Sequence, residues 1–308
     1  MTGADDPQGP VLAVVGPTAS GKSRVALEIA LTRTAAGHPT ELVAVDAFTV
    51  YRGMDLGTAK PTAAERAQVP HHLIDVLDPG EVLSVAAFRD LARAAIAGIL
   101  ARGATPLLVG GSGLYFRAVV DPLRFPPTDP QVRARLERRW ADDPAGAHAE
   151  VARCDPVAAE RIGAGNLRRS VRALEVWELT GEPFSAFDDS FRHHRSIYAG
   201  LEVVRLDPAT PVLRAAIEAR AVEMASAGLV EETARLHRAG PLSTTAAQAI
   251  GYAEAAEVLA GTLPPEELAA AVARRTWRYA RRQRSWFRSD PRADPVDAVA
   301  AVRRLTAV

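Results

Sequence analysis

Residues Gly16–Ser23 read Gly-Pro-Thr-Ala-Ser-Gly-Lys-Ser and match the pattern G-x-x-x-x-G-K-[ST] at every fixed position. This pattern has a structural meaning only between a strand and a helix. Here the apolar run Val11–Val15 predicts a short buried strand before the loop, and residues 23–36 predict a helix after it. The chain is therefore expected to contain the strand, phosphate loop and helix of a parallel sheet.

Such a loop presents several backbone N–H groups to one phosphate. Lys22 adds a positive charge, and the Ser23 hydroxyl is a candidate ligand of Mg²⁺. The helix is expected to bury the side that carries Val25, Ile29 and Leu31. The candidate phosphate site comprises Gly16, Pro17, Thr18, Ala19, Ser20, Gly21, Lys22 and Ser23. The pattern leaves open which phosphate compound binds there.

Further strand and helix patterns alternate along the chain: strands at 41–45, 106–109 and 201–206, and helices at 85–102 and 211–227. This alternation is typical of a parallel sheet with helices on both faces. Asp46 and the glycine-rich residues 110–113 each follow a strand end, where ligands of such sheets bind. The expected fold class is α/β, a P-loop NTPase-like parallel sheet core flanked by helices.

The pattern changes at a proline-rich junction, residues 121–127. From there to residue 195 it is helical, and the pairs Asp129-Pro130 and Asp155-Pro156 mark helix starts. We therefore expect a core formed by residues 1–125 and 196–308, with an inserted small all-helical domain at residues 126–195.

The composition and the terminal sequence indicate the cellular compartment in which the protein is expected. Cys154 is the only cysteine, so no intrachain disulfide can form and a reducing compartment is expected. Residues 1–10 are polar and do not resemble a signal peptide, and no apolar run is long enough to span a membrane. We expect a cytoplasmic protein without a membrane partner, and a monomer.

The formal net charge is zero, with 37 basic and 37 acidic residues, but the basic residues are clustered. No acidic residue interrupts the arginine-rich stretch 274–288, and further clusters lie at 161–172 and 192–195. Local basic stretches on a neutral chain fit a polyanion bound on one face. Solvated helix faces that pair with nearby acids are the alternative.

Two chemistries use a phosphate loop of this kind. In a small-molecule kinase, Asp46 would hold the metal or accept a proton from the acceptor hydroxyl. In the second chemistry, the loop binds a diphosphate that leaves an allylic carbon. Lys22, the loop N–H groups and Mg²⁺ would then stabilise the departing charge, while Asp46 accepts a proton from an attacking amine. The loop pattern alone does not decide between them.

Longer matches identify a resemblance to the tRNA dimethylallyltransferase family. These enzymes transfer a dimethylallyl group from dimethylallyl diphosphate to N6 of the adenosine next to the anticodon. The resemblance runs from Gly16 to Phe287. Beyond the phosphate loop it includes Tyr51–Pro61, His71–Asp75, Leu107–Tyr115, Arg169–Glu175, Ala249–Tyr252 and Arg281–Phe287.

The resemblance implies a role for each matching residue. The phosphate loop and Arg220 would bind the diphosphate, with Mg²⁺ on Ser23. Asp46 would be the general base on N6, with Thr18 and Lys22 beside the reacting groups. The tRNA-binding positions would be Asp46, Ala47, Phe48, Thr49, Ser112, Arg133, Arg168, Arg169, Arg172, Arg281 and Arg282. The partner would be the anticodon stem-loop of a tRNA, whose target base must leave its stack to reach the carboxylate.

This chain departs from the family pattern at two of these positions. Thr49 and Arg168 stand where the family commonly has glutamine. Threonine is shorter than glutamine and has one hydroxyl, so base recognition is expected to differ or to use a bridging water. An adenylate isopentenyltransferase, which acts on a free nucleotide, is the close alternative. The helical insertion and the arginine-rich stretch favour an RNA acceptor.

Overall fold

The computed structural model describes residues 9–187 and 193–307. It divides the chain into two compact units, one built from the segments 1–121 and 196–308 and the other from residues 122–195. The boundary of the second unit lies four residues before the expected position 126, at the start of the proline-rich junction. Each unit has a hydrophobic core of its own.

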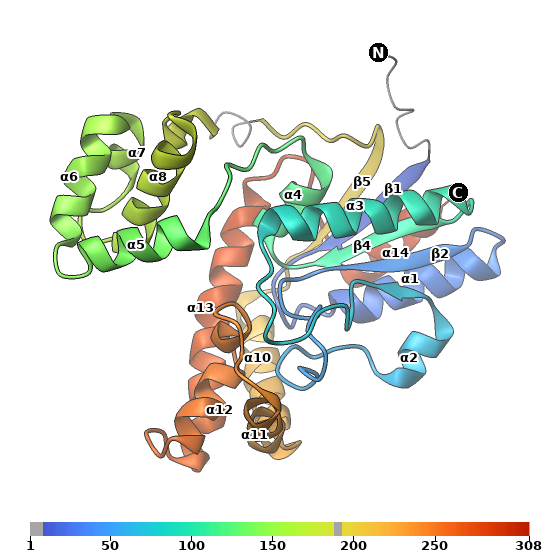
Figure 1. The fold of residues 1–308 in the computed structure, drawn as a ribbon. Helices are drawn as coiled ribbons and strands as arrows, with labels where there is room; N and C mark the ends of the chain where they lie inside the picture. The colour runs from blue at the N-terminus through green and yellow to red at the C-terminus, as the bar shows by residue number, and fades with distance from the viewer. Residues whose placement is uncertain (1–8, 188–192, 308) are drawn as a thin grey trace. The chain divides into compact units, whose positions relative to one another are not determined.

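The first unit contains a sheet of six parallel strands in the order β3-β2-β4-β1-β5-β6 (Figure 1). Four strands confirm the predicted ones: β1 Pro10–Val15, β2 Thr40–Val45, β4 Thr105–Gly110 and β5 Gly200–Leu206. The sequence patterns missed β3 His71–His72 and β6 Asp294–Val296, which form the two edges. The α/β fold class is confirmed.

Helices cover both faces of this sheet (Figure 1). On one face, α1 Lys22–Ala35 and α14 Ala298–Thr306 pack on alternate side chains of the strands. On the other face lie α3 Val85–Ala101 and α4 Gly113–Val120. In α1, Val25 and Ile29 are buried as expected, but Leu31 is 37% exposed because the buried side follows residues 25, 26, 29, 30 and 33.

The remaining helices of the first unit are α2 Ala63–Gln68, α10 Thr210–Ser226, α11 Leu229–Ala239, α12 Tyr252–Leu259 and α13 Leu268–Arg288, with short 3₁₀ turns at Ala246–Gln248 and Pro265–Glu267. Helix α10 packs along α13, and α11 packs against α12. Pro211 lies in the first turn of α10, where a missing N–H is tolerated.

All the regular secondary structure in the described residues of the second unit is helical. It consists of α5 Pro130–Trp140, α6 Pro144–Cys154, α7 Pro156–Arg161, α8 Leu167–Thr180 and a 3₁₀ turn at Phe184–Phe187. Asp129, Asp143 and Asp155 cap α5, α6 and α7 with their carboxylates, and a proline follows each of them. The two predicted helix starts, at Asp129-Pro130 and Asp155-Pro156, are therefore confirmed, and Asp143-Pro144 adds a third.

Candidate active site

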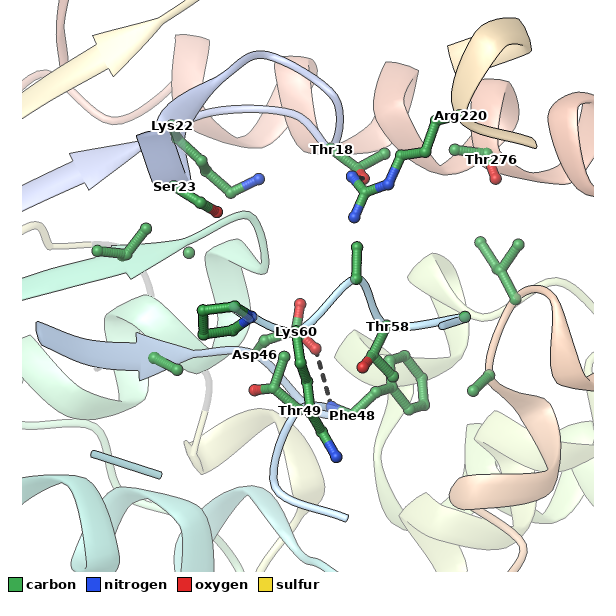
Figure 2. Close-up of a pocket in the computed structure, with 18 of the residues that line it drawn as sticks. Thr18, Lys22, Ser23, Asp46, Phe48, Thr49, Thr58, Lys60, Arg220 and Thr276 are labelled. Atoms are coloured by element: carbon green, nitrogen blue, oxygen red, sulfur yellow. Dashed lines mark hydrogen bonds between the residues drawn. The ribbon is translucent and has the colours of Figure 1, made fainter. Parts of the chain in front are cut away.

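A cavity of about 360 Å³ lies in the first unit, beyond the carboxyl ends of the central strands. The phosphate loop, the segment after β2, helix α10 and helix α13 supply its walls (Figure 2). The polar and charged side chains among its lining residues are Thr18, Lys22, Ser23, Asp46, Thr49, Thr58, Lys60, Glu65, His71, Arg220, Thr276, Tyr279 and Gln283.

The phosphate loop packs tightly against the end of β5. A Cβ atom at Gly16 would lie 2.4 Å from the carbonyl oxygen of Leu206, so only glycine fits there. Gly21 is the N-cap residue of α1, with φ of 84°, and supplies no side-chain hydrogen bond to the first turn. The N–H groups at the start of α1 therefore lack a side-chain acceptor, which favours an anion at this end.

Helix α13 fixes the loop from the other side. The Gln283 side chain accepts a hydrogen bond from the Thr18 N–H at 2.9 Å, across most of the length of the chain. A Cβ at Gly111 would lie 2.4 Å from Nε2 of Gln283, so the residue that follows β4 also approaches this amide closely. Gln283 was not among the predicted site residues. It lies in the matching stretch 281–287, and that was the only signal that could have identified it.

Two of the cations that line the cavity, Lys22 and Arg220, have no acidic side chain in contact within the described part of the chain. Nζ of Lys22 donates to the carbonyl of Pro17 at 3.2 Å, and Nη1 of Arg220 lies 3.3 Å from the Thr18 hydroxyl. Burial, and then the positive charge of Arg220, lower the pKa of Lys22 to about 8, although Asp46 acts in the opposite direction. Burial also lowers the pKa of Arg220. The arrangement favours an anion between the two side chains.

Asp46 follows β2 and lines the same cavity. Its Oδ1 accepts a hydrogen bond from the Phe48 N–H at 2.8 Å, which is an Asx turn (Figure 2). This bond fixes the carboxylate and leaves Oδ2 able to accept another proton or hydrogen bond. Figure 2 shows Asp46 across the cavity from Thr18 and Arg220. A base and two cations thus surround one space.

The three residues that follow Asp46 differ in whether they line the cavity. Phe48 and Thr49 line it, whereas Ala47 does not. Oγ1 of Thr49 is buried and has no hydrogen-bond partner within the described part of the chain. A buried hydroxyl without a partner in a cavity wall is a group that a ligand can satisfy.

Ser112 is not among the cavity-lining residues, although it is the N-cap residue of α4. Its hydroxyl does not cap that helix. Instead, it contacts Tyr279, which does line the cavity. Burial raises the pKa of Tyr279, and hydrogen bonds with Gln283 and Ser112 act against that rise. The phenol therefore stays protonated at neutral pH.

The predicted tRNA-binding arginines of the second unit are of two kinds. Arg168 and Arg169 are exposed at the start of α8. Arg133 and Arg172 both pair with Glu175, each at 2.7 Å, and the Glu175 side chain is completely buried. The latter two arginines therefore have a structural role, and only Arg168 and Arg169 present their guanidinium groups without an ion pair among the described residues.

The arginine-rich helix α13 is less free than its sequence suggests. Acids from distant segments neutralise part of it: Arg275 pairs with Glu254, while Arg284 and Arg288 pair with Asp207. The alternative, in which the arginines pair with acids, therefore holds at these three positions, with acids that are distant in sequence. The exposed arginines of the stretch are Arg274, Arg278, Arg281, Arg282 and Arg288, of which Arg282 lies 5.7 Å from the Tyr279 ring centroid.

Two features are absent from residues 9–187 and 193–307. No group of three or more histidine, cysteine, aspartate or glutamate side chains in these ranges could hold a metal ion. No helix in the same ranges is both long and apolar enough to cross a membrane.

A parallel sheet with a phosphate loop, facing cations and a carboxylate place the chain in the phosphate-loop class of α/β proteins. Residues 49–290 match the family model described as IPP transferase, so the chain belongs to the IPP transferase family. It is 49% identical to the tRNA dimethylallyltransferase of Kineococcus radiotolerans over 98% of each chain. It is also 47% identical to the enzyme of that name from Thermobifida fusca, over 97% of this chain and 93% of the other.

Solved structures agree. The full-length tRNA isopentenylpyrophosphate transferase from Bacillus halodurans matches with a TM-score of 0.68 and 36% identity, covering 97% of this chain and 95% of that one. A eukaryotic dimethylallyltransferase acting on tRNA matches with a TM-score of 0.78 over 94% of this chain and 74% of that one. Because the identity is 22%, this second match supports the fold alone.

Proposed function

We propose that this protein transfers a dimethylallyl group from dimethylallyl diphosphate to N6 of the adenosine next to the anticodon in tRNA, releasing diphosphate. The observation that carries the proposal is the single cavity in which Lys22, Arg220 and the phosphate loop face Asp46. Cations on one side suit a departing anion, and a carboxylate on the other suits a nucleophile that must lose a proton. The names of the relatives support the same reaction.

In the proposed reaction, the loop N–H groups, Lys22 and Arg220 bind the diphosphate. They stabilise the negative charge that develops as its bond to the allylic carbon breaks. The N6 nitrogen forms the new bond to that carbon, and Oδ2 of Asp46 accepts the N6 proton. The Thr18 hydroxyl, 3.3 Å from Arg220, lies where it orients the departing oxygens. Action as a monomer is part of the proposal.

A divalent cation fits this site. Ser23 offers an exposed hydroxyl at the start of α1, and the diphosphate would supply further oxygens of the kind that Mg²⁺ prefers. Ser23 would hold the ion, which would add positive charge beside the leaving group. The predicted requirement for Mg²⁺ is part of the proposal, together with a cytoplasmic location where tRNA is available.

The direct test uses an anticodon stem-loop RNA, dimethylallyl diphosphate and Mg²⁺, with prenylated adenosine measured by mass spectrometry. Asp46→Asn keeps the acceptor for the Phe48 N–H but loses the base, so the transfer rate should fall about 10²–10⁴-fold. Binding of the donor should be retained. A wild-type protein that cannot prenylate the stem-loop would refute the proposal.

Two alternative activities are tested by giving the same protein other substrates. An adenylate isopentenyltransferase would use AMP in place of the RNA, and a kinase would transfer the terminal phosphate of radiolabelled ATP to an acceptor. The inserted helical unit with exposed Arg168 and Arg169 favours the RNA acceptor. Faster prenylation of AMP than of the stem-loop would favour the first alternative.

A further inference from the structure

The segment 46–61, which carries Asp46 and the cavity-lining residues 57–61, has almost no regular secondary structure. The backbone is strained in this segment and in the neighbouring residues 73–75. Among the described residues, the non-glycine positions with positive φ are Ala19 in the phosphate loop and three residues here: Ala59, Leu73 and Asp75. Such conformations persist where surrounding contacts impose them, and they concentrate at functional sites. The contacts that impose them are therefore of interest.

The first of these contacts is made by Lys60, whose side chain is only 3% exposed. Its Nζ donates to the Tyr51 carbonyl at 2.6 Å, to Asp55 at 2.8 Å and to Asp75 at 2.6 Å. The Asp75 N–H in turn donates to the carbonyl of Thr49 at 3.2 Å. Figure 2 shows the Lys60 side chain directed away from Lys22. With three acceptors in place, this ammonium holds the segment together and has no donor left for a diphosphate.

The second contact is made by Glu232 of α11, which is 4% exposed. Its carboxylate accepts from the N–H groups of Asp55 and Leu56 at 3.0 Å each, and from the Tyr252 hydroxyl at 2.5 Å. The Gly57 N–H reaches the same Tyr252 oxygen at 3.2 Å.

Tyr252 also shapes this contact sterically. A Cβ at Gly57 would lie 2.4 Å from the Tyr252 ring, so the backbone lies directly on the ring. The two contacts meet at Asp55, whose N–H binds Glu232 and whose carboxylate binds Lys60.

We propose that Lys60 and Glu232 are positioning residues that hold the segment 46–61 so that Asp46 faces the phosphate loop. Both act through buried charge-assisted hydrogen bonds to the segment, which are stronger than neutral ones and costly to leave half made. Neither needs to touch the substrates. The inference rests on the proposed function, because it concerns the alignment of the base in that reaction.

The test compares Lys60→Met and Glu232→Ala with two matched controls. Arg52→Ala lies in the same segment and breaks an exposed ion pair with Asp78, and Glu231→Ala changes the exposed neighbour of Glu232. Both Lys60→Met and Glu232→Ala should lower kcat about 10–100-fold, the loss expected when a reacting group is misplaced by about 1 Å. The dissociation constant of the donor should change less than about threefold, and both controls should keep wild-type kcat.

A second measurement is hydrogen exchange over residues 46–61, which should become faster in Lys60→Met and Glu232→Ala but not in the controls. If Glu232→Ala does not fold, Glu232→Gln keeps an acceptor for the two N–H groups and should give an intermediate kcat. The inference would be overturned if either variant lost its affinity for the donor, as expected for a variant without the Lys22 charge, or if kcat were unchanged. The proposed function would remain intact in both cases. An inactive wild-type protein would instead remove the proposed function, and the inference with it.

Discussion

Lys22 and Arg220 place two positive charges beside one another in a partly buried site. Burial and this proximity lower the pKa of Lys22, which means that the protein without ligand bears an unfavourable interaction there. An anion that binds between them removes the cost. The same residues that suit the site to a diphosphate therefore reduce the stability of the unliganded protein, a common trade-off at functional sites.

Lys22→Met should separate these two effects. The variant should unfold at the same temperature as the wild type or a higher one in the absence of ligand, because the repulsion with Arg220 is gone. Inorganic diphosphate at 100 times its dissociation constant should stabilise the wild type by about 2.7 kcal/mol, and the variant much less at the same concentration. Differential scanning calorimetry with and without diphosphate measures both. An undiminished diphosphate effect in Lys22→Met would exclude the lysine from the anion site.

The role of the Thr49 hydroxyl can be tested by a substitution that changes little else in the side chain. Its Oγ1 is buried without a partner, so Thr49→Val replaces a hydroxyl with a methyl group at nearly constant volume. Stability should stay the same or rise, since an unsatisfied polar group is removed. If the hydroxyl binds the acceptor base, KM for the stem-loop should rise about tenfold, which corresponds to ~1.4 kcal/mol. Steady-state kinetics checks this, with the donor KM as internal control. An unchanged KM for the RNA would mean that Thr49 does not contact the base.

The buried carboxylate of Glu175 joins two elements of the helical unit, α8 and the start of α5. It accepts hydrogen bonds from Arg133, Arg172, the Thr128 hydroxyl and the Asp129 N–H. Burial alone would raise the pKa of Glu175, but the hydrogen bonds from the two arginines and from Asp129 and Thr128 lower it overall. Removing one partner from such a buried ion-pair network strongly destabilises the folded state.

Glu175→Ala should therefore destabilise the helical unit by about 3–5 kcal/mol, because it leaves Arg133 and Arg172 without their acid. Glu178→Ala on the same helix breaks a more exposed pair with Arg135 and should cost only about 0–1 kcal/mol. Hydrogen exchange of residues 128–180 reports the unit separately from the rest of the chain. Equal effects of the two substitutions would contradict the structural role of Glu175.

The same carboxylate predicts an acid dependence. Its pKa in the folded protein lies below the unfolded value of about 4.3, so the unfolded state binds more protons in this range. The stabilisation is therefore present above about pH 4.3 and is lost as the pH falls through the lowered, folded value. The exchange-derived stability of the helical unit should show this loss in the wild type, and Glu175→Gln should reduce it. A pH dependence unaffected by Glu175→Gln would place the responsible group elsewhere.

The elements that sequence patterns predicted are those whose signal is local. β1, β2, β4 and β5 are runs of apolar residues bounded by polar or glycine residues, and α3 and α10 are long enough for a helical period. The edge strands β3 and β6 have two and three residues, and β6 contains a proline, so neither carries such a signal. Their pairing depends on the neighbouring strand, which no local pattern reports.

The candidate site divides in the same way. The phosphate loop and Asp46 could be predicted because a motif and a strand end mark them. Gln283, Lys60 and Glu232 could not be assigned a role, because each acts on backbone that is distant in sequence or irregular in conformation. The ion pairs of Arg284 and Arg288 with Asp207 join residues that lie 77 and 81 positions apart. A reading of local charge therefore overestimated how free the arginine-rich helix is.

At the scale of the whole molecule, a chain of zero formal charge still presents a basic surface. Acids from other segments neutralise Arg275, Arg284 and Arg288 of α13, whereas Arg274, Arg278 and Arg281 are exposed and have no ion pair with any residue in the described ranges. Arg274 and Arg278 lie one helical turn apart and so face the same side of α13. This distribution suits contact with the phosphates of a single-stranded or looped RNA.

The double variant Arg274→Ala, Arg278→Ala should therefore weaken binding of the anticodon stem-loop without changing donor binding. Each phosphate contact on single-stranded RNA contributes about 0.7 to the slope of log affinity against log salt concentration, so the slope should fall by about 1.4. Fluorescence anisotropy over a range of salt concentrations measures it. Arg304→Ala is the matched control, because Arg304 already pairs with Glu202 and Asp294. A slope equal to that of the wild type would show that this side of α13 does not contact the RNA backbone, and the acceptor would then have to be bound by other basic residues.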